Sequence, residues 1–177
     1  FEDNLNFTRE MSGLATRALA GVEGELGRIT GNEDGMTAHD LEARMTDPDQ
    51  AAEFARETGI CALAVCIGNI HGVYEKEPDL DFDRLEAIRN RVDLPLVLHG
   101  SSGLPDWMIQ KAVSLRVCKF NVNTEVRSAY IRSMGAMFAK GRKPELTEIM
   151  KQGMAAMAVP VKEKIELFGS AGKAQTQ

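Results

Sequence analysis

Four strand-length segments alternate with longer segments of helical periodicity along the chain. The strands are expected to end near residues 27, 68, 100 and 123, and the runs over 60–68 and 94–98 are continuously apolar. Apolar residues recur at helical spacing between the strands, which predicts helices over residues 47–58, 82–91, 105–115 and 125–140. Strands that are buried on both faces and alternate with helices predict a parallel sheet in an α/β fold.

Two further helices are expected at the ends of the chain. Residues 1–20 place Phe7, Met11, Leu14 and Ala18 at helical spacing, which predicts that these residues face the core. Residues 145–167 predict a long final helix, followed by a polar tail. Because no linker interrupts the chain, residues 1–177 are expected to form a single domain. The four strand-helix units fit either a small open sheet or half of an eight-stranded barrel, and the spacing does not separate these two folds.

Composition narrows the class of protein. The chain is 44% hydrophobic and 27% charged with a net charge of −5 and a pI near 5.3, which argues against a nucleic-acid partner. No apolar run reaches the length of a membrane span. Three cysteines, Cys61, Cys66 and Cys118, lie in apolar strand-like runs, which indicates buried free thiols in a reducing compartment. The cytoplasm is therefore the expected location.

Polar residues gather where each predicted strand ends. Glu23 and Glu25 end the first strand, Asn69 and His71 follow the second, His99 follows the third, and residues 121–124 end the fourth. The carboxyl ends of parallel strands form one edge, where the active sites of such folds assemble. Four strands agree on this edge, so we expect the functional site there.

His71 and His99 lie about one strand-helix unit apart, and each is followed directly by glycine. Neighbouring strands could bring both imidazoles to one point, and imidazole is a preferred zinc ligand. A catalytic zinc usually takes three protein ligands, so the pair is one short. The alternative is that each histidine only binds a loop carbonyl, and the residues alone leave both interpretations open. His39, in a Gly-rich loop, is expected to be exposed to solvent.

Two small-residue loops are candidates for phosphate binding. Gly100–Gly103 and Asn121–Thr124 offer hydroxyls and backbone N–H groups just ahead of predicted helices, where a helix dipole favours an anion. The alternative is an ordinary turn with a Ser or Thr cap. Glu33 in the Gly-rich loop could swing in as a proton shuttle, although a loop glutamate is more often only solvated. Lys119, on a strand, is interpreted as a structural or rim residue.

Four motifs occur in an order that resembles the class II fructose/tagatose-bisphosphate aldolase family. They are Val22-Glu-Gly-Glu-Leu-Gly27, Gly68-Asn-Ile-His-Gly-Val-Tyr74, Leu98-His-Gly-Ser-Ser-Gly103 and Asn121-Val-Asn-Thr-Glu125. The segment over residues 161–172 is similar to the family's last helix. The resemblance covers nearly the whole chain and implies a (β/α)8 TIM barrel, of which about the last four strand-helix units are present.

The resemblance also implies a reaction and a set of site residues. It implies zinc-dependent aldol cleavage of a phosphorylated ketose to dihydroxyacetone phosphate and an aldehyde. Glu33 is implied in proton transfer, and the metal ligands implied are His71, His99 and, in an alternative metal position, Glu25. The substrate-binding residues implied are Gly72, Gly100, Ser101, Ser102, Asn121, Val122, Asn123 and Thr124. By analogy with the family, the complete protein is expected to form homo-oligomers.

Three departures from the family pattern qualify these expectations. The family's His-x-Asp-His segment, which carries a zinc ligand and a catalytic aspartate, would lie upstream of Phe1, so the chain alone is expected to be inactive. Thr30 stands where the family usually has glycine, and Met154 stands where bisphosphate-cleaving relatives tend to have arginine. The alternatives are therefore a non-catalytic phosphate-binding half-barrel and an aldolase for a monophosphorylated ketose.

Overall fold

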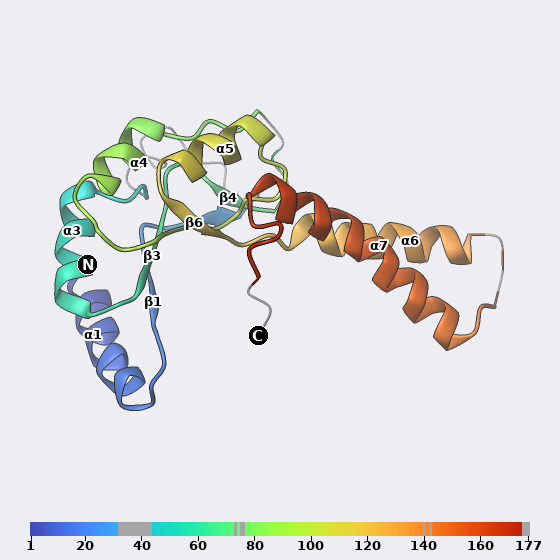
Figure 1. The fold of residues 1–177 in the computed structure, drawn as a ribbon, viewed down its shortest axis with the longest axis horizontal. Helices are drawn as coiled ribbons and strands as arrows, with labels where there is room; N and C mark the ends of the chain where they lie inside the picture. The colour runs from blue at the N-terminus through green and yellow to red at the C-terminus, as the bar shows by residue number, and fades with distance from the viewer. Residues whose placement is uncertain (32–43, 73, 75–76, 140, 142, 175–177) are drawn as a thin grey trace.

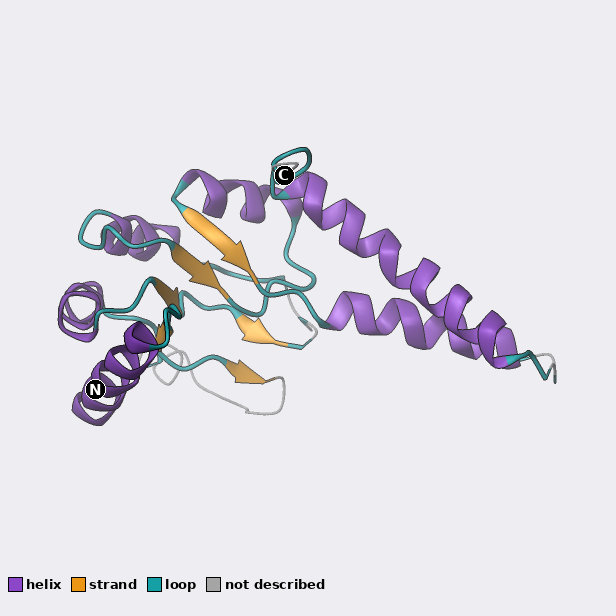
Figure 2. Cartoon of the chain, turned by 60° about the horizontal axis from the view of Figure 1, so that its bottom comes forward, coloured by secondary structure: helices purple, strands orange, loops and turns teal. Residues whose placement is uncertain are grey.

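Four parallel strands form the main sheet of the computed structural model, which describes residues 1–31, 44–72, 74, 77–139, 141 and 143–174. The strands are β1 (Glu23–Leu26), β3 (Ala62–Val65), β5 (Leu96–Leu98) and β6 (Val117–Phe120), and they lie in the order β1-β3-β5-β6. Each neighbouring pair is parallel. The predicted α/β class and its four strand-helix units are confirmed, as Figure 2 shows.

Six helices accompany the sheet in the described part of the chain. They are α1 (Glu2–Arg17), α3 (Pro48–Thr58), α4 (Phe82–Arg89), α5 (Asp106–Ser114), α6 (Thr124–Phe138) and α7 (Leu146–Leu167). Figure 1 shows α3, α4 and α5 around the outside of the sheet, while α6 and α7 extend away from it as a pair. This arrangement is that of part of a (β/α)8 barrel, in which helices surround the strands. None of these helices is long and apolar enough to cross a bilayer.

A second, very small sheet lies beyond the carboxyl ends of the main strands. It consists of β2 (Thr30–Gly31) and β4 (Ile70–His71), which pair in parallel. Its strands are too short for a periodic pattern, so the sequence did not predict them. This small sheet fixes the backbone that carries His71.

The two faces of the main sheet differ in chemistry. The face toward the helices carries fully buried leucines that pack in one cluster with residues of α3, α4 and α5, among them Leu63, Leu96, Leu98, Phe54, Leu85 and Ile109. On β1 this face has Gly24, where an added Cβ would lie 2.8 Å from the Phe54 ring. Residues alternate between faces along a strand, so Glu23 and Glu25 lie on the opposite face, the inner face of a barrel wall.

Local sequence signals set the boundaries of α3 as predicted. Asp47 caps the helix by accepting hydrogen bonds from the backbone N–H groups of Asp49 and Gln50. Pro48 occupies the first helical position, where its missing N–H removes no hydrogen bond. Gly59 ends the helix in the left-handed conformation with φ of 69°. The sequence therefore predicted both ends of this helix correctly.

The predicted buried face of the first helix is wrong. Phe7 is 63% exposed and Leu14 is 45% exposed, whereas Leu5, Thr8 and Ser12 are the buried residues of α1. The helix packs against α3, and the small side chains of Thr8 and Ser12 allow a close approach. Apolar spacing alone identified a face that is rotated from the true contact face.

The prediction of three buried thiols is also wrong for two of them. Cys66 is buried, but Cys61 and Cys118 are exposed. Cys118 lies at a shift in register on β6, because Leu96 pairs with Val117 while the next residue, Val97, pairs with Lys119. Cys118 is thus an extra residue on β6, an edge strand of the described sheet. All three cysteines are free.

Candidate active site

Two histidines lie side by side at the carboxyl edge of the strands. His71 ends β4, and His99 directly follows β5. Their ring centroids are 6.1 Å apart, with the rings nearly perpendicular. The sequence prediction that the two imidazoles meet at one edge is therefore supported by their geometry.

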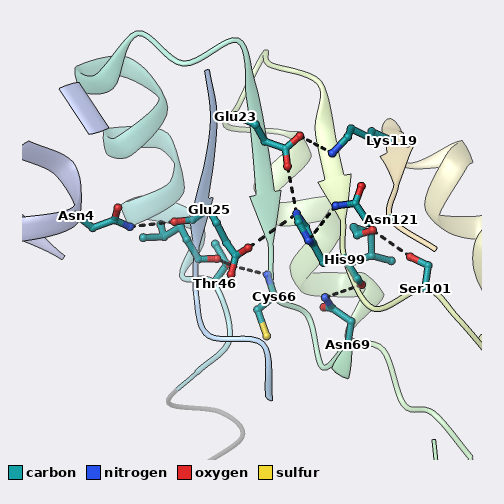
Figure 3. A network of polar contacts seen from close by, with 12 residues as sticks. Asn4, Glu23, Glu25, Thr46, Cys66, Asn69, His99, Ser101, Lys119 and Asn121 are labelled. Atoms are coloured by element: carbon teal, nitrogen blue, oxygen red, sulfur yellow. Dashed lines mark hydrogen bonds and ion pairs between the residues drawn. The ribbon is translucent and has the colours of Figure 1, made fainter. Parts of the chain in front are cut away.

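Side chains from β1 and from the segment after β6 contact the ring of His99 (Figure 3). Its Nε2 atom is 3.2 Å from Oε1 of Glu23 and 3.9 Å from Oε2 of Glu25. Its Nδ1 atom is 3.1 Å from Nδ2 of Asn121. The His99 carbonyl oxygen accepts a hydrogen bond of 3.1 Å from Nδ2 of Asn69. Both the ring and the backbone of His99 are thus held by polar contacts.

Glu23 also forms an ion pair across the sheet. Its Oε2 atom accepts a hydrogen bond of 2.8 Å from Nζ of Lys119 on β6. Partial burial acts to raise the pKa of the Glu23 carboxyl, but the hydrogen bonds from Lys119 and His99, together with the positive charge of Lys119, outweigh burial and hold the pKa below its ordinary value. Glu23 is therefore a carboxylate at neutral pH.

The loops after β4 and β5 are held together by Tyr74. Its hydroxyl accepts a hydrogen bond of 3.1 Å from the Ile70 N–H and donates one of 3.0 Å to the Gly100 carbonyl. Burial raises the pKa of the Tyr74 hydroxyl. Gly100 has φ of 63°, and a Cβ there would overlap the carbonyl oxygen of Ile70. Glycine is thus required at position 100 for both conformation and space.

A cavity of about 770 Å³ opens beside the two histidines. Both imidazoles line it together with the small residues of the loops that follow β4, β5 and β6. The lining residues are His71, Gly72, His99, Gly100, Ser102, Phe120, Asn121, Val122, Asn123, Thr124 and Arg127. Nine of these were singled out by the sequence as candidate metal or substrate residues.

Several candidate residues lie elsewhere. Ser101 is fully buried, and its hydroxyl donates to the Leu98 carbonyl at 3.0 Å, so its side chain does not line the cavity. Glu25 does not line it either, although it approaches His99. Glu33 and His39 lie outside the described residues, as does the side chain of Thr30. Met154 is on α7, 62% exposed, and lines neither this cavity nor a second one of about 640 Å³ beside α6 and α7.

Arg127 and Phe120 are cavity residues that the sequence analysis missed. Arg127 lies in the first turn of α6, after the Asn121–Thr124 segment. The sequence signal for Arg127 was a basic residue in the first turn of a helix, where acidic residues are favoured. Among the described residues, no group of three His, Cys, Asp or Glu side chains is arranged to hold a metal ion.

Known proteins match the chain along nearly its whole length. The family model of class-II fructose-bisphosphate aldolases matches residues 1–173. A sulfofructosephosphate aldolase of Alkalicoccus urumqiensis is 39% identical over 177 residues, which is 99% of this chain and 62% of that protein.

Solved structures agree with this match. The YdjI aldolase from Escherichia coli K12 is 39% identical with a TM-score of 0.81, over 98% of this chain and 59% of that one. A putative fructose-1,6-biphosphate aldolase from Coccidioides immitis is 35% identical with a TM-score of 0.82, over 97% of this chain and 60% of that one. The chain thus spans about 60% of the length of these relatives. It belongs to the class-II fructose-bisphosphate aldolase family.

Proposed function

We propose that the chain is the C-terminal part of a zinc-dependent aldolase. The reaction is the cleavage, or the reverse condensation, of a phosphorylated ketose of the fructose- or tagatose-bisphosphate type to dihydroxyacetone phosphate and an aldehyde. The observation that carries this proposal is the meeting of His71 and His99 beside the cavity. Family membership supports aldol chemistry.

The separation of the two histidines is close to that of a pair that shares one zinc ion. Two imidazoles that bind one zinc at about 2.1 Å hold their ring centroids roughly 5–6 Å apart, and the observed separation is 6.1 Å. His71 and His99 would hold the ion, with Glu25 as the ligand of an alternative position. A catalytic zinc usually has three protein ligands, and we propose that the third lies in the part of the relatives that this chain does not match. Bound zinc would supply positive charge that stabilises an enediolate.

The loops that line the cavity are suited to a phosphate group. Gly72, Gly100 and Ser102 leave space for close approach of an anion, and Asn121–Thr124 leads into the N-terminus of α6. A helix N-terminus favours an anion through its dipole and unpaired N–H groups. Arg127 adds a positive charge to the same wall. We propose that dihydroxyacetone phosphate binds there, with Glu33 as the residue that moves the proton.

Mutation of the histidines tests this proposal. The complete protein should bind zinc and release triose phosphate from a ketose bisphosphate. His71→Ala and His99→Ala should each lower zinc content and reduce turnover by at least about a hundredfold, because each removes a metal ligand. His39→Ala is the matched control, since the sequence gives this histidine no place in the site. Normal turnover and zinc content in both variants would refute the proposal.

The number of phosphates on the substrate is a second question. One relative is named for sulfofructosephosphate rather than for a bisphosphate, so a ketose with a single phosphate is the second candidate. Met154 is exposed and lines neither cavity. The difference from the family at this position therefore does not concern the binding of the first phosphate. Turnover of sulfofructosephosphate, fructose bisphosphate and tagatose bisphosphate by the complete protein should be compared. The largest kcat/KM identifies the substrate class.

The proposal also covers the cellular location of the protein and its self-association. The three free cysteines support a reducing compartment, and we propose the cytoplasm. Exposed apolar side chains on α6 and α7 support self-association of the complete protein; they are Ile131, Phe138, Leu146, Met150, Met154, Val159, Val161 and Ile165. Sedimentation of the complete protein tests this point.

A further inference from the structure

Glu23 binds two partners at once, one with each carboxylate oxygen (Figure 3). Oε1 lies 3.2 Å from Nε2 of His99, and Oε2 lies 2.8 Å from Nζ of Lys119. A carboxylate with both oxygens engaged cannot rotate without breaking one of these contacts. Lys119 therefore fixes the carboxylate plane that faces the imidazole.

The Glu23–Lys119 pair spans the whole main sheet. Glu23 is on β1 and Lys119 is on β6, the two outer strands. Three strand spacings amount to roughly 14 Å in a flat sheet, so the pair forms only because the wall curves and both side chains reach inward. Ala64 and Val97 lie between them on the same face. Their compact side chains leave room for Glu23 and Lys119 to meet above them.

The partners of the His99 ring agree on one tautomer. Nε2 faces a carboxylate, which only accepts hydrogen bonds, so Nε2 carries the proton. Nδ1 faces the amide nitrogen of Asn121, which only donates, so Nδ1 has the lone pair. The two sides of the ring are thus set by independent neighbours, and the contact from Glu23 depends in turn on Lys119.

We propose that Glu23, held by Lys119, is a positioning residue that sets the tautomer and ring plane of His99. Histidines that bind a metal commonly donate their other N–H to a carboxylate, which fixes the ring and raises its basicity. The pair would then keep Nδ1 unprotonated, as a metal ligand must be, and a metal ion bound there would take the place of the Asn121 contact. The consequence for metal binding rests on the proposed function, whereas the effect on the tautomer does not.

The tautomer can be measured directly on the complete protein in its metal-free form. The 15N chemical shifts of the two ring nitrogens of His99 distinguish protonated from unprotonated nitrogen, and His99→Gln identifies the signals. The unsubstituted chain should show a protonated Nε2. Glu23→Gln and Lys119→Met should both move His99 toward a mixture of tautomers, and Lys119→Arg should restore the original shifts because it keeps the positive charge.

Zinc affinity in the complete protein is the second readout. Loss of a residue that orients a metal ligand typically lowers metal affinity about 10- to 100-fold, so Glu23→Gln should do so in competition with a chelator. Glu57→Gln is the control, because Glu57 also forms ion pairs but with Arg9 and Arg56, away from the histidines. If Glu23→Gln fails to fold, Lys119→Met serves alone, since Lys119 is half exposed.

The outcomes separate this inference from the proposed function. A changed tautomer in both variants supports the positioning role, even if the complete protein binds no zinc and the proposed function fails. An unchanged tautomer in Glu23→Gln and Lys119→Met overturns the positioning role, even if the protein is an active zinc aldolase. In that case the Glu23–Lys119 pair would be only a structural ion pair that connects β1 with β6.

Discussion

The hydroxyl of Tyr74 donates a hydrogen bond of 3.0 Å to the carbonyl oxygen of Gly100 and so ties the loop after β4 to the loop after β5. The same hydroxyl accepts from the Ile70 N–H. The first of these loops follows His71 directly, and the second begins with the glycine that follows His99. The distance between the two histidines therefore depends on a phenol that lies beside them and not only on the strands.

Tyr74→Phe should destabilise the chain by about 1–3 kcal/mol, because it leaves the Ile70 N–H without its partner in a partly buried place. Urea unfolding followed by circular dichroism measures the change. Tyr130→Phe is the matched control, because the Tyr130 hydroxyl makes no hydrogen bond within the described part of the chain. Equal stability of the two variants would show that the Tyr74 hydrogen bonds contribute nothing to the free energy of unfolding.

Gly100→Ala should be the most damaging single-methyl change in the site. Alanine at φ of 63° is strained, and its Cβ would overlap the Ile70 carbonyl, so we expect a loss of at least about 2–3 kcal/mol in the free energy of unfolding. Gly135→Ala is the matched control, because Gly135 is inside α6 and the added Cβ would meet no atom within 4 Å beyond its chain neighbours and the backbone of its own helix.

In the control variant, the free energy of unfolding should change in the opposite direction. Alanine has a higher helix propensity than glycine, so Gly135→Ala should gain about 0.5–1 kcal/mol. The unfolding midpoint in urea, measured on both variants, checks the two signs together. Loss of stability in Gly135→Ala, or none in Gly100→Ala, would contradict the described backbone.

The strands and helices could be predicted from the sequence because their signals are local. The cap at Asp47 and the apolar run ending at Gly68 each act within a few residues. The active-site edge was predictable for a related reason, since parallel strands bring their carboxyl ends to one side. His71 and His99 were paired on that basis alone.

Other features depend on contacts distant in sequence and were not predictable. The buried face of α1 is set by its packing on α3, where Ser12 faces inward and Phe7 does not. The exposure of Cys118 follows from a register shift between β5 and β6. The Glu23–Lys119 contact joins residues that are far apart in the chain, and no local pattern in either strand predicts it.

The three thiols should differ in how fast they react. Cys61 and Cys118 are exposed, whereas Cys66 is buried and burial raises the pKa of its thiol. Because the thiolate is the reacting form, two thiols per chain should react rapidly with a disulfide reagent at pH 8 and the third only after unfolding. Cys61→Ser and Cys118→Ser should each remove one rapid thiol. Three equally fast thiols would contradict this division.

Cys66 should also make stability depend on pH in the alkaline range. Its ordinary pKa is 9.0 and the folded value is higher, so the folded chain keeps a proton that the unfolded chain loses. Stability is therefore fully present below pH 9 and falls as the pH rises through the folded pKa. Urea unfolding between pH 8 and pH 10.5 should show a smaller fall in Cys66→Ala than in the unsubstituted chain. Cys61→Ala, which removes an exposed thiol, should leave the fall unchanged.

Lys164 on α7 and Glu125 at the start of α6 should together order the loop that contains Ser102. Glu125 accepts a hydrogen bond of 2.6 Å from the Gly103 N–H with one oxygen, and its other oxygen lies 3.1 Å from Nζ of Lys164. The Lys164 side chain is only 14% exposed, so Lys164→Met should cost about 1–3 kcal/mol by leaving Glu125 without its cation.

The loop itself should respond to this change more than the core does. Hydrogen exchange of residues 100–104 should become faster in Lys164→Met, because the released Glu125 carboxylate can turn from the Gly103 N–H to water. Lys162→Met is the matched control, since Lys162 is exposed on the same helix and forms no ion pair among the described residues. If exchange of the loop stays unchanged while global stability falls, Lys164 holds only the two helices together, and the loop is ordered by Tyr74 and Gly100 alone.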